Sequence, residues 1–80
     1  MNPSDITPLI EAGFKDAVVT VASDDNTHFE TVIIASEFAG LRPLARHQLV
    51  YRTLGSLVGN EIHALSIRAY TLDEWQQQAG

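Results

Sequence analysis

The chain contains no cysteine among its 80 residues. This absence excludes disulfide bonds, a thiol nucleophile and any metal site built only from the chain's own thiolates. Catalytic and phosphate-binding signatures are also missing, since no GxSxG, GxxxxGKS/T or GxGxxG motif occurs. A chain this short also leaves little concavity for a substrate pocket. We therefore predict a protein that is not an enzyme.

Basic residues are few, since five lysines and arginines stand against ten acidic residues and give a net charge of −5. This charge opposes unassisted binding to nucleic acid or to an anionic membrane, because neutralising phosphates supplies most non-specific affinity. Arg42 and Arg46 nevertheless lie four residues apart on the edge of a predicted helix. This basic stripe is either a solvated helix edge or a surface for an acidic partner or nucleic acid.

Long apolar runs are absent as well. No segment approaches the roughly 20 apolar residues that span a bilayer. The first residues carry neither the basic segment nor the apolar run of a signal peptide. With 45% hydrophobic residues and no repeats or low-complexity segments, the sequence predicts a single cytoplasmic domain over residues 1–80.

Hydrophobic periodicity predicts helices and strands in the order α-β-β-α-β-α. After a short N-terminal helix, the expected elements are a strand, a second strand, a long helix, a third strand and a final helix, over residues 17–23, 28–36, 43–58, 61–70 and from 71. Ser4 or Thr7 is the expected cap of the first helix. The last helix begins with a capping box of Thr71 and Glu74.

The predicted topology brings two distant histidines together. The first two strands form an antiparallel hairpin, and the third returns through a helix to lie parallel to its neighbour. If that neighbour is the second strand, the beginnings of both strands lie at one end of the sheet. His28 and His63 stand at these beginnings. We therefore expect residues 35 positions apart to be neighbours.

Each histidine also has a structural interpretation. His47 lies within an apolar helix face between Leu44 and Tyr51, which predicts a packed, neutral ring that makes one hydrogen bond. His63 shares strand parity with the apolar positions 65 and 67, so it is either a half-buried strand residue or a ligand. His28 is either a solvated loop residue beside a carboxylate or a ligand. Two imidazoles are too few to complete a tetrahedral zinc site.

Tyr51 and Trp75 are predicted to have packing roles. Tyr51 belongs to the predicted apolar face and is expected in the core. Trp75 follows the last capping box and is expected to pack the final helix onto the sheet.

Three segments together resemble the BolA-like family, in particular its short bacterial branch (YrbA/IbaG). They read SEFAGLRPLARHQLVYRTL, IHALSIRAYTLDEW and THFETVIIAS. The resemblance implies an α+β fold of the KH-like second type, with a three-stranded mixed sheet packed against helices. This agrees with the predicted element order.

The resemblance also implies a function. BolA-like proteins pair with monothiol glutaredoxins, and the heterodimer shares a [2Fe–2S] cluster to which glutaredoxin and glutathione contribute thiolates. His63 matches the family's signature histidine, and His28 is the available nitrogen ligand in the hairpin loop. In many relatives the loop ligand lies a few residues earlier, where this chain has Asp24, Asp25 and Asn26. His28 therefore swings in, or a carboxylate fills the second position, or the position stays open. No cluster is expected in the isolated chain.

A second theme of the family is transcriptional regulation. The Arg42/Arg46 edge would be the surface for DNA, although the segment GLRP at 40–43 does not provide the GxxG loop of KH domains. The other possibilities that the sequence leaves open are a bare interaction module and a weak homodimer of the isolated chain.

Overall fold

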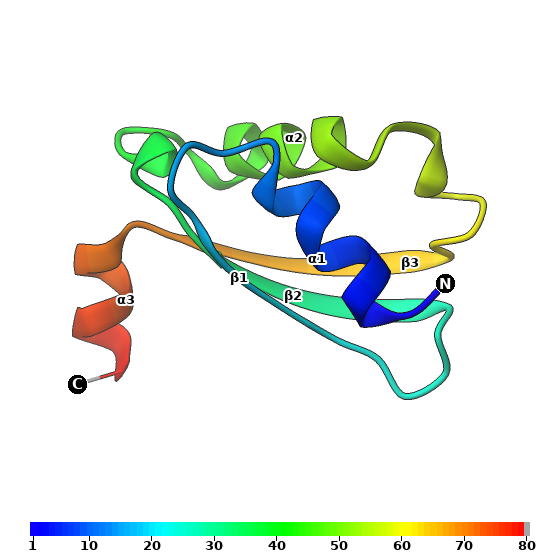
Figure 1. Cartoon of the computed structure of the whole chain (residues 1–80). Coiled ribbons are helices and arrows are strands. Elements are labelled where there is room, and N and C mark those ends of the chain that lie inside the picture. Colours follow the sequence, from blue (N-terminus) through cyan, green and yellow to red (C-terminus); the bar gives the residue numbers. More distant parts are fainter. Residues whose placement is uncertain (80) are drawn as a thin grey trace.

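The computed structural model describes residues 1–79 and contains the predicted elements in the predicted order (Figure 1). Their bounds are α1 Pro3–Glu11, β1 Val18–Ala22, β2 His28–Ile34, α2 Pro43–Leu54, β3 Ala64–Tyr70 and α3 Leu72–Ala79. One mixed sheet has the order β1-β2-β3, with β1 antiparallel to β2 and β2 parallel to β3. The predicted α+β class and strand pairing are confirmed.

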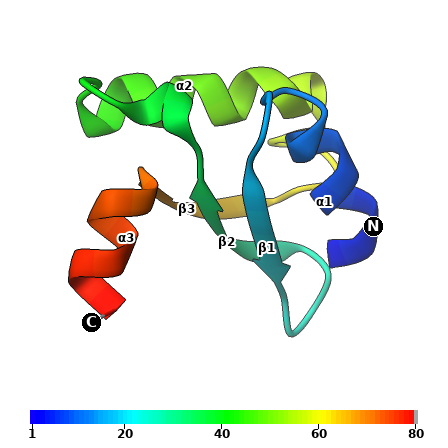
Figure 2. The ribbon, with the colours of Figure 1, turned by 60° about the vertical axis from the view of Figure 1, so that its left-hand side comes forward.

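The helices α1 and α2 cover one face of the sheet and leave the other face open (Figures 1 and 2). Along β2, the alternate residues Phe29, Thr31 and Ile33 are buried beneath these helices. This alternation is expected for a sheet with only one covered face. α3 lies at the end of the sheet opposite the β1–β2 loop (Figure 1). The two ends of the sheet therefore carry different structures.

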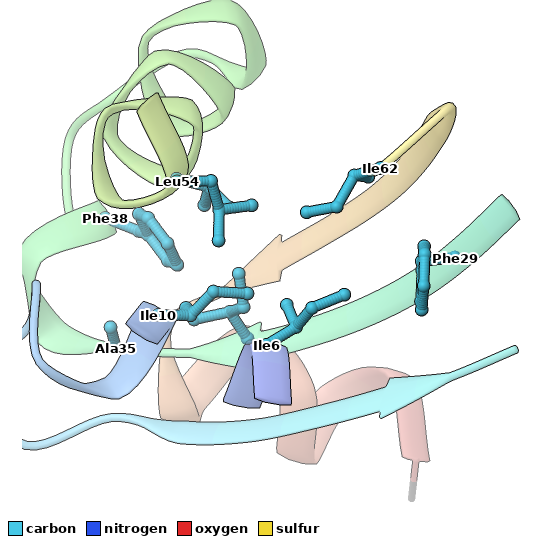
Figure 3. Packing of buried hydrophobic residues seen from close by; sticks show 9 residues of the cluster. Ile6, Ile10, Phe29, Ala35, Phe38, Leu54 and Ile62 are labelled. Atoms are coloured by element: carbon cyan, nitrogen blue, oxygen red, sulfur yellow. The ribbon is translucent and has the colours of Figure 1, made fainter. Parts of the chain in front are cut away.

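A cluster of buried apolar side chains fills the space between the helices and the sheet (Figure 3). α1, the sheet, α2 and the connecting segments all contribute to it, through Ile6, Ile10, Phe29, Ile33, Ala35, Phe38, Val50, Leu54 and Ile62. Burying a large apolar side chain contributes about 1.5–3 kcal/mol relative to leaving it exposed. Contacts from this cluster fix α1 and α2 on the sheet and leave both sheet ends accessible.

Of the two predicted helix caps, that of α3 is confirmed and that of α1 is wrong. In α3 the capping box is confirmed, because Thr71 N donates to Glu74 Oε1 at 2.9 Å and Glu74 N donates to Thr71 Oγ1 at 3.3 Å. The cap of α1 was predicted wrongly at Ser4 or Thr7. Asn2 caps this helix and accepts from Ser4 N at 3.0 Å, while Asp5 closes the box. The helix begins at this Asn2/Asp5 capping box because the box satisfies two N–H groups that would otherwise be unpaired.

The buried face of α2 matches only part of the predicted apolar face. Val50 and Leu54 belong to the predicted face and are buried, which is confirmed. Leu44 and Tyr51 were also expected inside but are 71% and 41% exposed. The helix turns the side that carries Arg46 toward the sheet, where this residue hydrogen-bonds to main-chain carbonyls. α2 also ends at Leu54 and not near position 58, because Gly55 adopts φ 55° and breaks the helical path.

Within residues 1–79, no helix combines the length and apolar character needed to cross a membrane.

Candidate metal site at the hairpin end of the sheet

His28 and His63 lie against each other at the end of the sheet where β2 and β3 begin. His28 pairs with Ala64 in the parallel register, and His63 N donates to Thr27 O at 2.8 Å. The imidazole centroids are 5.9 Å apart and the ring planes meet at 62°. Both residues are exposed. The prediction that these histidines are neighbours is confirmed.

His63 is exposed because the preceding residue, Ile62, is the one that packs into the core. Ile62 is fully buried, and its main chain is held by hydrogen bonds to Leu57 and Gly59. His63 lies one position before β3, so strand alternation does not govern its side chain. The expectation that it points to a buried face with position 65 is wrong. Its exposed ring is instead accessible to a second molecule.

The ring of His28 is held by Asp25 in the hairpin loop. Asp25 Oδ1 accepts from Thr27 N at 3.0 Å and from His28 N at 2.9 Å. Asp25 Oδ2 lies 2.7 Å from His28 Nδ1. The backbone N–H of His28, then that of Thr27, hold the pKa of the Asp25 carboxyl far below its usual range, with the His28 ring as a further cause. Asp25 therefore stays ionised under ordinary conditions.

Further hydrogen bonds order the same loop. Ser23 Oγ donates to His28 O at 2.6 Å and accepts from Asn26 N at 2.9 Å. Asn26 has φ 59°, a left-handed conformation that asparagine tolerates better than most residues. These hydrogen bonds of the turn fix the position of His28 at the beginning of β2.

A cavity of about 360 Å³ opens beside His28 on the uncovered face of the sheet. Its lining includes the small residues Ala22, Ala64 and Ser66 and the acidic residues Asp24 and Glu30. The space leaves the His28 ring accessible from the open face as well as from the sheet end.

The donor set of this end suits a shared metal group and not a closed metal site. Within residues 1–79, no group of three or more His, Asp or Glu side chains is arranged to hold a metal ion. Both oxygens of Asp25 are engaged by N–H groups or by the His28 ring. The nitrogen donors that face outward here are the two imidazoles. Any further ligands would have to come from another molecule.

The Arg42/Arg46 edge is not a pair of free cations. Arg46 donates to Glu74 Oε1 and Oε2 at 2.6 and 3.0 Å, to Ala69 O and to Leu41 O. Its side chain is only 12% exposed, against 44% for Glu74. The Arg46 guanidinium, followed by Thr71 N–H, lowers the pKa of Glu74 to about 2. Arg42 is exposed at the N-cap of α2. The predicted stripe is therefore reduced to Arg42 and more distant arginines.

His47 and Trp75 both lie outside the histidine site and are half-buried. His47 is half-buried, and its ring finds no hydrogen-bond partner among residues 1–79, so the expected bond is not present. Trp75 is half-buried, and its ring lies 5.5 Å from that of Tyr70. Trp75 thus packs α3 against the end of β3, as predicted.

Comparison with known proteins decides the family. The profile described as BolA-like protein matches residues 10–74, which is most of the chain. The chain belongs to the BolA-like family.

Relatives of this BolA-like chain fall into long and short forms. It is 49% identical over 57 residues to the DNA-binding transcriptional regulator BolA of Vibrio cholerae, a match that covers 71% of this chain and 54% of the relative. The chain thus spans about half the length of that protein. It is 38% identical over 78 residues to an uncharacterized protein in the rpoN-murA intergenic region of Acinetobacter guillouiae, covering 96% of this chain and 93% of the relative.

A solved structure confirms the fold of the BolA-like chain. A bolA protein homologue from Coxiella burnetii superposes with a TM-score of 0.83 at 42% identity, covering 95% of this chain and 97% of the other. The short relatives that match from end to end agree with the short bacterial branch.

Sequence reasoning on the BolA-like chain missed two roles. Asp25 was treated as a loop carboxylate, although an aspartate two and three residues before the N–H groups it binds is the signature of an Asx turn. The partnership of Arg46 with Glu74 joins residues 28 positions apart. No local pattern marks such a pair.

Proposed function

We propose that this BolA-like protein is a non-enzymatic adaptor of the cytoplasm that binds a monothiol glutaredoxin and shares a [2Fe–2S] cluster with it. His63 and His28 would be the ligands from this chain. The observation that carries the proposal is the contact of two exposed imidazoles at one end of the sheet, with ring centroids 5.9 Å apart. Two distant segments converge there and place both rings where a partner can reach them.

The donor count supports a shared site. This chain offers two outward-facing nitrogen donors at the sheet end and has no cysteine. A glutaredoxin with its bound glutathione would complement them with two thiolates. Neutral imidazoles in place of thiolates reduce the negative charge around iron, which raises the reduction potential and makes binding sensitive to protonation.

Neighbouring residues of this chain hold the two histidines in position. A main-chain hydrogen bond to Thr27 ties His63 to the loop that precedes β2. Asp25 holds the ring of His28 through Nδ1 and leaves Nε2 for a ligand bond. Both oxygens of Asp25 are engaged, which supports His28 over Asp25 as the second ligand.

The test is anaerobic cluster reconstitution of a monothiol glutaredoxin and glutathione with this protein, followed by visible absorption and circular dichroism. We expect a heterodimer spectrum that differs from that of the glutaredoxin homodimer and is lost in His63→Ala. His28→Ala should weaken or alter it. His47→Gln is the matched control, because it changes a histidine that lies on α2 and outside the site, and it should leave the spectrum unchanged. An unchanged homodimer spectrum with the wild-type protein would contradict the proposal.

A DNA-binding regulator is the second candidate, since the Vibrio cholerae relative bears that name. Against it stand the net charge of −5 and the engagement of Arg46 by Glu74. Salt-dependent binding to duplex DNA that is lost in Arg42→Glu, with no iron dependence, would favour this candidate. Arg42 is the better position for charge reversal, because altering Arg46 would also break its internal hydrogen bonds.

A further inference from the structure

We propose that Asp25 is the positioning residue of the histidine site: it holds His28 in the Nδ1–H tautomer and thereby presents the Nε2 lone pair to the partner. This inference rests on the proposed function, because it assigns the means by which one of its ligands is prepared. Asp25 would act through His28 and not as a ligand.

The carboxylate of Asp25 is placed independently of the imidazole. Its Oδ1 accepts two main-chain N–H groups, from Thr27 at 3.0 Å and from His28 at 2.9 Å. These bonds belong to the turn that Ser23 and Asn26 also stabilise. The position of Oδ2 is therefore set by the backbone, and the ring of His28 aligns with it at 2.7 Å.

An ionised carboxylate can only accept hydrogen bonds. A neutral His28 that bonds to Asp25 Oδ2 must therefore carry its proton on Nδ1. Thr27 Oγ1 lies 3.0 Å from the same nitrogen and adds a second oxygen there. Nε2 is then the unprotonated nitrogen, which is the form that binds a metal. Histidine ligands commonly depend on such a carboxylate to fix the tautomer and orient the ring.

The open side of the ring is consistent with this role. The His63 ring meets that of His28 in an edge-type arrangement, and the cavity on the uncovered face adjoins His28. His28 is 63% exposed although Asp25 restrains it. Restraint without burial is what a ligand presented to another molecule requires.

The test reads the tautomer directly, in the complete chain and without any cluster. Long-range ¹H–¹⁵N spectra, recorded well above the usual titration range of imidazole, distinguish Nδ1–H from Nε2–H. We expect His28 in the Nδ1–H form in the wild type and mainly in the Nε2–H form, which a free imidazole favours, in Asp25→Ala. Asp24→Ala is the matched control, because it removes the same charge from the adjacent position without touching the ring. His47 and His63 serve as internal references.

Asp25→Asn separates positioning from simple support of the loop. Its carboxamide oxygen can still accept the two main-chain N–H groups that Oδ1 accepts now, but the NH2 group then faces His28 Nδ1 and can only donate. This variant should therefore keep the turn and lose the Nδ1–H form. If the wild-type ring is Nε2–H, or if Asp25→Ala leaves the tautomer unchanged, the positioning role is overturned. Amide spectra that match the wild type outside residues 23–28 would verify that the variants are folded.

Cluster measurements distinguish failure of this inference from failure of the proposed function. Asp25→Ala should accelerate loss of the heterodimer cluster about 10–100-fold, the usual cost of removing such a partner. Asp16→Ala, which removes the same charge from an exposed residue at the opposite end of the sheet, should not. A wild-type heterodimer that forms and is unaffected by Asp25→Ala contradicts the positioning role alone. An Nδ1–H tautomer that depends on Asp25, without any heterodimer cluster, supports the positioning role and contradicts the adaptor function.

Discussion

Asp25 and Glu74 organise opposite ends of the sheet through the same chemistry. Asp25 accepts two main-chain N–H groups of its own turn and Glu74 accepts one. Each carboxylate also engages one side chain, the ring of His28 or the guanidinium of Arg46. These hydrogen bonds favour the ionised form and lower both pKa values, for Glu74 from 4.5 to about 2. A residue that looks like surface charge in the sequence can thus determine local geometry.

The depressed pKa of Glu74 predicts a loss of stability in acid. Because its folded pKa lies below its usual value, the Glu74–Arg46 pair stabilises the fold above pH 4.5, and this contribution disappears as the pH falls toward about 2. Urea unfolding of wild type and Glu74→Gln should therefore differ at neutral pH and converge across this window. Glu11→Gln, on an exposed part of α1, is the control for general charge effects. A difference that persists unchanged at the acid end would contradict the assignment.

At the level of elements, the close approach of α1 and α2 explains why a glycine occupies position 13, two residues after α1. A Cβ at Gly13 would collide with Thr53 Cγ2 and lie 3.2 Å from Thr53 Cβ. Thr53 cannot readily rotate away, because its Oγ1 donates to Val50 O at 2.6 Å. The side chain at position 13 therefore limits how closely the end of α1 approaches α2.

This contact predicts a coupled pair of mutations. Gly13→Ala should lower the free energy of unfolding by about 1–3 kcal/mol through overpacking. Thr53→Ser removes the obstructing methyl group but keeps the hydroxyl, so the cost of Gly13→Ala should be smaller in that background. Chemical denaturation of the two single variants and the double variant gives the coupling free energy. Equal costs in both backgrounds would show that Thr53 is not the obstacle.

At the scale of the whole molecule, the sheet face that α1 and α2 cover contains the hydrophobic core, which stabilises the fold. The histidine site lies at the hairpin end of the sheet, outside this core. Phe38 joins several elements, since its ring meets that of Phe14 edge-on at 5.3 Å and lies 5.9 Å below the guanidinium of Arg46. A chain of 80 residues has a small core, so each such side chain is a large share of the total stability.

Two substitutions of apolar residues should therefore differ sharply. Phe38→Ala removes a fully buried side chain and should lower the free energy of unfolding by about 3–5 kcal/mol. Leu44→Ala changes a residue that is 71% exposed and should stay within about 0.5 kcal/mol of wild type. Urea denaturation measures both. A cost for Leu44→Ala comparable to that of Phe38→Ala would restore the predicted apolar face of α2.

The same topology explains how the histidine site forms. A parallel β2–β3 pair places the beginnings of both strands side by side, so His28 and His63 meet although 35 positions separate them. The order of elements and the handedness of the crossover predicted this on the condition that β3 lies beside β2, and the sheet order β1-β2-β3 meets that condition. The exposure of the histidines was not predictable in this way, because it depends on Ile62, which takes the buried position just before β3.

The sequence by itself determined the element order, the antiparallel hairpin and the last capping box, because these depend on local periodicity and on chain connectivity. It placed the two histidines together on the condition that β3 pairs with β2, and the structure meets that condition. The tertiary structure decided which side of α2 is buried, that Arg46 is held by Glu74, and that Asp25 holds the ring of His28. These features depend on how rigid elements pack and on where side chains meet. Hydrophobic pattern reports that a residue can be buried, but the contacts of the folded chain determine which residues are.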